Sequence, residues 1–61
     1  MATKLKMRRE ACCKTQVEVA FAANITVISY YRYEAGARLP RVDVAIRIAK
    51  ALNCTVEDIF D

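Results

Sequence analysis

Two motifs that each begin with a threonine predict where helices start in this chain. In residues 15–18 and again in residues 55–58, a threonine is followed three residues later by an acidic side chain. In such a capping box the threonine hydroxyl and the carboxylate satisfy two backbone N–H groups that the first turn of a helix leaves unpaired. Helices are therefore predicted to begin just after Thr15 and Thr55.

The residues between and around these motifs predict three more helices. Residues 3–12 have a weak amphipathic stripe in which Arg8 takes an apolar position. After a helix stop at Asn24, Thr26 can cap a third helix that runs to about residue 34. The only glycine and the only proline lie in residues 35–40, the principal loop, and Pro40 can stand at the start of the fourth helix.

The fourth helix, residues 41–52, has the clearest periodicity. Its apolar positions recur at helical spacing, and Asn53 ends it. The expected stripe is Val42, Ala45, Ile46, Ala49 and Leu52. The short fifth helix is expected to bury Ile59 and Phe60. No segment alternates as a strand does, so the predicted fold class is all-α with five helices.

Length and composition limit the classes of protein that remain. With 61 residues, 56% of them apolar and 28% charged, the chain is expected to form one small folded domain over residues 1–61 with no appended effector domain. The longest uncharged run, residues 19–31, is shorter than the ~20 apolar residues of a bilayer span. No secretory leader is expected either, because the basic start is followed by charges instead of an apolar stretch. A cytoplasmic protein that does not contact a membrane is expected.

The cysteines and the absent histidine argue against catalysis and metal binding. Cys12, Cys13 and Cys54 form an odd set with two members adjacent, which suits a reducing compartment better than a disulfide framework. Without histidine or a Cys-x-x-Cys pair, no closed zinc site and no acid or base poised near neutral pH is expected. We therefore expect neither cofactor nor enzyme activity, and inert cysteines rather than redox sensors.

The charge distribution favours a polyanionic partner. Residues 1–41 contain eight basic and three acidic side chains, whereas residues 42–61 contain two basic and four acidic ones. A basic body with an acidic end suits nucleic acid as a partner, with the acidic end turned away from it.

The ordered set of motifs resembles a known family. A Thr-Gln pair opens a helix, Ala20 follows four residues after the glutamine, and a short turn leads to a helix that ends in Glu-Ala-Gly at residues 34–36. Pro40 and the segment Leu-Asn-Cys-Thr-Val-Glu-Asp-Ile-Phe at residues 52–60 complete the pattern. Over nearly its whole length the chain resembles the phage repressor and Cro-type (XRE) helix-turn-helix family. The resemblance implies a compact, lambda-repressor-like domain with the helix-turn-helix in the second and third helices.

The resemblance implies particular DNA contacts. In the family the third helix lies in the major groove, and its N-terminal residues meet base edges. The matching base-contacting positions are Val27, Ile28 and Arg32. Arginine can donate two hydrogen bonds to guanine, whereas valine and isoleucine can read only thymine methyl groups. The positions expected near the DNA backbone are Thr15, Gln16, Thr26, Ser29, Tyr31, Arg38 and Arg41. Of these, Arg41 is also a candidate for the minor groove.

A protein-binding alternative remains for part of this surface. Val27 and Ile28 can instead cover a core edge or a partner surface, and Phe21 adds an apolar side chain where the family is usually polar. Together they leave open an antitoxin-like protein-interaction module built on the same fold.

Other matches imply structural roles. Arg9 and Glu34 match an ion pair between the first and third helices of several repressors, and Tyr30 and Tyr33 occupy core-facing positions. The chain departs from the family where Arg8 and Lys14 replace apolar residues. Cys13 and Asn24 replace glycines, and the first connection is expected to differ from the family pattern because a cysteine with positive φ is strained.

The function implied is that of a sequence-specific transcriptional regulator. The expected protein is a repressor, bacterial or phage-encoded and nucleoid-associated, that binds an inverted-repeat operator in double-stranded DNA as a homodimer. The expected dimer patch lies around Leu39, Cys54 and Val56.

Overall fold

The computed structural model describes residues 4–60 and confirms the all-α prediction for them. Within this range the helices are α1 (Lys4–Ala11), α2 (Gln16–Ala22), α3 (Val27–Glu34), α4 (Val42–Ala51) and α5 (Val56–Ile59), with no strand. The predicted first helix started at residue 3, which lies outside the described residues. No helix in the described part is long and apolar enough to cross a membrane.

The three predicted threonine caps are confirmed. The Thr15 Oγ1 accepts from the Glu18 N–H at 3.1 Å, while the Thr15 N–H donates to the Glu18 carboxylate at 2.8 Å. Thr55 and Asp58 make the same reciprocal pair at 3.3 and 3.0 Å. Thr26 caps α3 by accepting from a backbone N–H three residues later. Each hydroxyl satisfies a donor that the helix cannot pair by itself, which fixes where the helix begins.

The connections between helices contain residues with a left-handed backbone conformation, and most of these residues are not glycine. Cys13, Asn24 and Asn53 have φ of 56°, 58° and 59°, and Gly36 has 77°. Asparagine tolerates this conformation, which the sequence predicted for Asn24 and which the structure also shows at Asn53. Cys13 also adopts it, so the first connection takes the left-handed turn despite the strain of a side chain with a Cβ.

The start and the buried stripe of α4 differ from the prediction. Arg41 is the N-cap and Val42 the first helical residue, so Pro40 lies outside the helix instead of beginning it. The buried positions are Ala45, Ile48, Ala49 and Leu52. Ile46 is 41% exposed and Val42 is 77% exposed. Seven of the ten residues of α4 are apolar, so its sequence is compatible with two overlapping apolar stripes. Packing against the other helices selects the one that contains Ile48.

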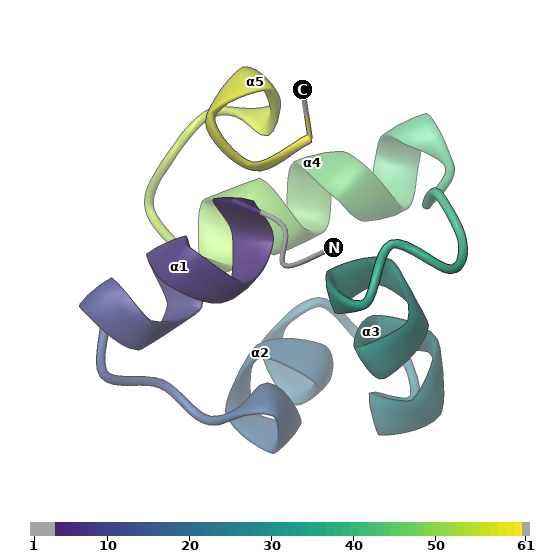
Figure 1. Cartoon of the computed structure of the whole chain (residues 1–61), viewed down its shortest axis with the longest axis horizontal. Coiled ribbons are helices and arrows are strands. Elements are labelled where there is room, and N and C mark those ends of the chain that lie inside the picture. Colours follow the sequence, from purple (N-terminus) through teal and green to yellow (C-terminus); the bar gives the residue numbers. More distant parts are fainter. Residues whose placement is uncertain (1–3, 61) are drawn as a thin grey trace.

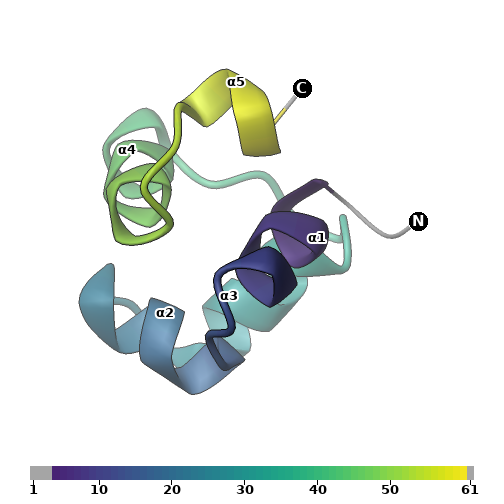
Figure 2. The ribbon, with the colours of Figure 1, turned by 90° about the vertical axis from the view of Figure 1, so that its left-hand side faces the viewer.

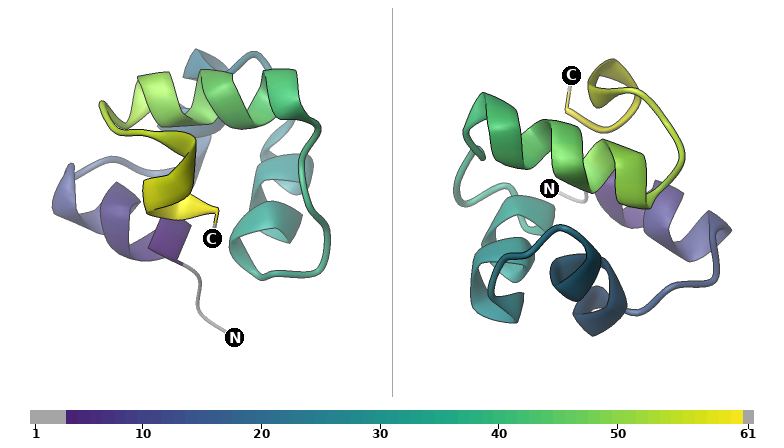
Figure 3. Two further views of the ribbon diagram at one scale, coloured as in Figure 1. Left: turned by 90° about the horizontal axis from the view of Figure 1, so that it is seen from above. Right: turned by 180° about the vertical axis from the view of Figure 1, so that it is seen from behind.

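A single cluster of buried side chains holds the helices together. Helix α2 packs against α3 and α4, and α5 packs against α1 and α4. Figures 1 and 2 show α2 and α3 on one side of the molecule and α5 on the other, and Figure 3 shows α4 running along one edge. The core consists of Leu5, Val19, Ala20, Ala23, Tyr30, Ile48, Ala49, Leu52 and Ile59.

Two arginines satisfy the carbonyl groups at helix ends. The Arg8 Nε donates to the Leu52 carbonyl at 3.1 Å, and its Nη2 donates to the Asn53 carbonyl at 3.0 Å. The Arg47 Nε donates to the Ala23 carbonyl at 2.9 Å. The last carbonyls of a helix have no partner within the helix, so these guanidinium groups complete the ends of α4 and α2. The position at which Arg8 replaces an apolar residue is therefore used for a polar contact between helices.

Candidate nucleic-acid interface

Helices α2 and α3 form a helix-turn-helix. The turn between them is closed by hydrogen bonds from the Asn24 N–H to the Phe21 carbonyl at 3.1 Å and from the Ile25 N–H to the Ala20 carbonyl at 3.0 Å. On its inner side α3 buries Tyr30 completely and leaves Glu34 only 5% exposed. The opposite side of α3 is therefore free to face a partner.

The three residues predicted to contact bases lie on that outer side. Ile28 is 62% exposed and Val27 is 41% exposed, while Arg32 is also exposed. Residues four apart in a helix share a face, so Ile28 and Arg32 stand one turn apart on the same surface. The exposed face of α3 thus combines an apolar first turn with a guanidinium group one turn later. Phe21, on α2, is exposed as well, at 85%.

The residues predicted to contact the DNA backbone divide into two groups. The hydroxyls of Thr15 and Thr26 are engaged as helix caps. Thr26 also donates to the Ser29 hydroxyl at 2.9 Å. In contrast, the side chains of Tyr31, Arg38 and Arg41 are exposed. The Arg41 guanidinium lies 3.9 Å from the Asp43 carboxylate, but both groups are well exposed, and a solvated pair of this kind adds little stability.

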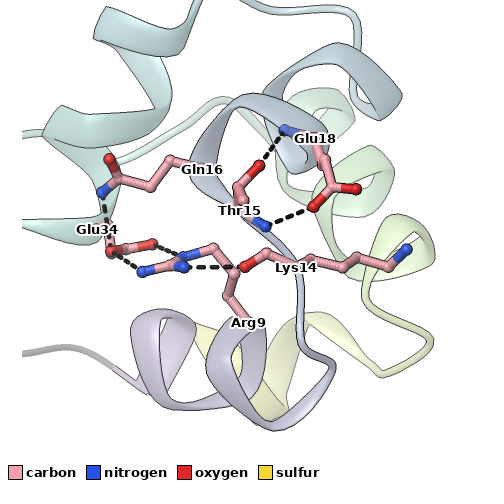
Figure 4. A network of polar contacts seen from close by, with 6 residues as sticks. All are labelled: Arg9, Lys14, Thr15, Gln16, Glu18 and Glu34. Carbon is pink, nitrogen blue, oxygen red and sulfur yellow. Dashed lines mark hydrogen bonds and ion pairs between the residues drawn. The ribbon is translucent and has the colours of Figure 1, made fainter.

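A polar network behind the helix-turn-helix connects α1, α2 and α3. The Arg9 Nε and Nη2 donate to the two Glu34 carboxylate oxygens at 2.9 and 3.1 Å, which confirms the predicted ion pair. The Arg9 Nη1 reaches the Lys14 carbonyl at 2.9 Å. The Gln16 side chain donates to the same Glu34 carboxylate at 3.0 Å, as Figure 4 shows. A bidentate arginine thus holds the end of α3 against the connection that leads into α2.

The Gln16 contact adds to what the sequence predicted. Gln16 was expected only to bind a phosphate, yet its amide N–H group is directed to Glu34. Gln16 and Glu34 are 18 positions apart in the sequence, so no local sequence pattern predicts their contact. The side chain is therefore held in place before any partner arrives.

The ionisation of Glu34 follows from these contacts. Burial pushes the pKa of its carboxyl upward, but the hydrogen bonds from Arg9 and Gln16, together with the neighbouring Tyr30 hydroxyl, outweigh burial and hold that pKa below its ordinary value of 4.5. The same hydrogen bond to Glu34 raises the pKa of Arg9. Burial, and then the neighbouring Glu34 carboxylate, raises the pKa of the Tyr30 hydroxyl. At neutral pH the network therefore contains a charged pair beside a neutral tyrosine.

None of the three cysteines belongs to α3. Cys12 and Cys54 are half-buried and pack against the core, and Cys13 is exposed. Burial raises the pKa of the Cys54 thiol, although Arg8 opposes the shift, so this thiol stays protonated at neutral pH.

An apolar groove lies between the start of α4 and α5. Its volume is about 310 Å³, and it is lined by Leu39, Pro40, Val42, Ala45, Val56 and Phe60. Leu39 is 81% exposed at its rim. Of the three residues predicted for a dimer patch, Leu39 and Val56 line the groove, whereas Cys54 does not.

Comparison with known proteins identifies the family. A family model described as Helix-turn-helix matches residues 5–59. The chain belongs to this helix-turn-helix family. It is 34% identical over 56 residues to the cryptic phage CTXphi transcriptional repressor RstR of Vibrio cholerae serotype O1. That match covers 92% of this chain and 50% of RstR, so the chain spans about half the length of its relative. The predicted phage repressor and Cro-type (XRE) membership is confirmed.

Proposed function

We propose that this helix-turn-helix protein is a sequence-specific regulator of transcription that reads double-stranded DNA through α3. The observation that carries the proposal is the exposed outer face of α3, with Val27, Ile28 and Arg32 projecting from a helix whose inner side is fixed by Tyr30 and Glu34. A rigid helix with exposed side chains in its first turns is what a major groove accommodates. The repressor function of the relative RstR, together with the basic body of this chain, supports repression as the outcome.

We further propose that the protein binds an inverted repeat as a homodimer. The groove of Leu39, Pro40, Val42, Ala45, Val56 and Phe60 supports this, because it is apolar and its lining comes from the loop before α4, from α4 and from the α5 segment, none of which belongs to α2 or α3. A second copy of the chain seated there leaves both α3 helices free. A small module buries little DNA surface by itself, so pairing supplies the affinity, with half-sites about ten base pairs apart.

Selection of binding sites from a random duplex library tests the proposal. At ~150 mM salt, exposed charges more than about 8 Å apart are largely screened, so non-specific attraction to phosphates is weak. The wild type should enrich an inverted repeat that contains a guanine in each half. Arg32→Ala should lose the preference for that guanine, at about 1–3 kcal/mol of discrimination. The control is Lys50→Ala, which removes an exposed basic residue from α4. Binding without any enriched motif would overturn the proposal.

The exposure of Phe21 favours one alternative, a protein-interaction module of the antitoxin type. The Phe21 side chain on α2 is 85% exposed and adds to the exposed Val27 and Ile28 on α3, and larger exposed apolar surfaces often mark protein contacts. In that case Val27→Asp should disrupt a complex with a protein partner and leave DNA affinity unchanged. Under the main proposal the same substitution should instead weaken DNA binding, because it places a carboxylate against the phosphates.

A further inference from the structure

The first turn of α3 presents almost only hydrocarbon to a partner. The Thr26 hydroxyl accepts from the Ser29 N–H at 3.1 Å and donates to the Ser29 hydroxyl at 2.9 Å, so its hydrogen-bonding capacity is directed into the helix. Ser29 itself is half-buried. The exposed side chains of this turn are Val27 and Ile28, which have no hydrogen-bonding group.

Hydrocarbon side chains can discriminate only one feature of the major groove. Three of the four bases show only hydrogen-bonding groups there, whereas thymine adds a methyl group at C5. A cytosine methylated at C5 presents the same methyl group at the equivalent place. Contact between that methyl group and a valine or isoleucine removes apolar surface from water, which strengthens binding by about fourfold for one buried methyl group.

We propose that Val27 and Ile28 read the C5-methyl group of pyrimidines, so that DNA binding by this chain depends on methylation at C5. This inference rests on the proposed function, because it assigns a base feature to the same face of α3. Thymine and 5-methylcytosine are then equivalent ligands of the first turn, and uracil and unmodified cytosine are equivalent poor ones. Methylation of a cytosine in an operator half-site then directly strengthens binding of the protein to that operator.

The position of the methyl group relative to the guanine follows from helix geometry. Ile28 and Arg32 are four residues apart, which is a rise of about 6 Å along α3. Successive base pairs rise about 3.4 Å. The methylpyrimidine read by Ile28 should therefore lie within about two base pairs of the guanine read by Arg32.

Base analogues placed in the selected operator test the inference. In one duplex, each thymine near the guanine is replaced in turn by uracil, which removes only the methyl group and keeps the base pair. In another, the same T·A pair becomes C·G or 5-methylcytosine·G. We expect uracil to weaken wild-type binding about fourfold per methyl group in contact, and 5-methylcytosine to bind more tightly than cytosine by a similar factor. Binding is measured by fluorescence anisotropy of the labelled duplex.

Protein variants identify which side chain carries the effect. Ile28→Ala and Val27→Ala each shorten an exposed side chain, so both should fold as the wild type does. Each should abolish discrimination between thymine and uracil at one position and leave the guanine preference intact. Met7→Ala is the matched control, because Met7 is an apolar side chain on α1 with 66% exposure.

The possible outcomes separate this inference from the proposed function. If an operator is selected but no thymine-to-uracil replacement changes the affinity, the methyl readout is wrong and the regulator proposal stands. If uracil weakens binding equally in the wild type and in both alanine variants, the methyl group acts through DNA shape and the assignment to Val27 and Ile28 is overturned. If no operator is selected at all, the proposed function fails first.

Discussion

At the scale of single residues, the Glu34 side chain on α3 is hydrogen-bonded to residues of both α1 and α2. Its carboxylate accepts two hydrogen bonds from Arg9 and one from Gln16, and it is almost completely buried. A buried carboxylate is tolerated only when its oxygens are paired in this way. The contact therefore fixes how α3 lies against α1 and α2, and with it the direction of the exposed face.

Replacing Glu34 with glutamine should change both the stability and its dependence on pH. A carboxyl whose folded pKa is held below 4.5 stabilises the fold above pH 4.5, and that contribution is lost as the pH falls through the folded pKa. Glu34→Gln should lower the free energy of unfolding at pH 7 by roughly 1–3 kcal/mol, because Arg9 loses a charged partner. The difference from the wild type should shrink toward pH 3.

Urea unfolding at pH 7 and at pH 3 measures this effect. Glu57→Gln, which removes an exposed carboxylate from α5, serves as the control. Glu18 and Asp58 also have carboxyl pKa values below the ordinary range, because of hydrogen bonds from Thr15 and Thr55, so the wild type retains some acid sensitivity in every variant. A Glu34→Gln protein with a wild-type pH profile would contradict the assignment.

At the scale of elements, the connection between α1 and α2 is the strained one. Cys13 has φ of 56°, a conformation that costs a residue with a Cβ about 1–2 kcal/mol. Cys13→Gly should therefore raise the free energy of unfolding by about 1 kcal/mol, after allowing for the greater freedom of glycine in the unfolded chain. Cys13→Ala keeps the Cβ and should not stabilise. Thermal unfolding of both variants checks the prediction, and equal melting temperatures would refute it.

The sequence predicted those parts of the elements that have local causes. Thr15, Thr26 and Thr55 each cap a helix because the partner N–H lies three residues away, and Asn24 ends α2 by its own backbone preference. The first turn of α3 was likewise expected to expose Val27 and Ile28. In contrast, Arg8 donates to a carbonyl 44 residues away, and no local pattern encodes that contact. The choice of Ile48 over Ile46 was missed for the same reason, since only the packed neighbours decide it.

At the scale of the whole molecule, the surface proposed to bind DNA and the surface proposed to form the dimer are made by different helices. Under the proposal, the outer face of α3 binds DNA, and the apolar groove beside α4 and α5 binds a second copy of the chain. Leu39→Asp places a charge at the rim of that groove and should shift the protein from dimer to monomer in sedimentation equilibrium. Phe21→Asp, on the other side, should remain dimeric. The monomer should bind the inverted repeat about 10²- to 10⁴-fold more weakly. In the dimer, binding to one half-site raises the effective concentration of protein at the other, and the monomer loses this effect. A Leu39→Asp protein that stays dimeric would place the interface elsewhere.

The reach of Arg8 across the molecule also bears on how the chain folds as it leaves the ribosome. Helix α1 is synthesised first, but the carbonyls of Leu52 and Asn53 that anchor it are made 44 and 45 residues later. At ~5–20 residues per second the nascent helix waits about 2–9 seconds for them. During that interval the Arg8 guanidinium lacks these two acceptors, so this anchoring of α1 depends on the synthesis of residues 52 and 53.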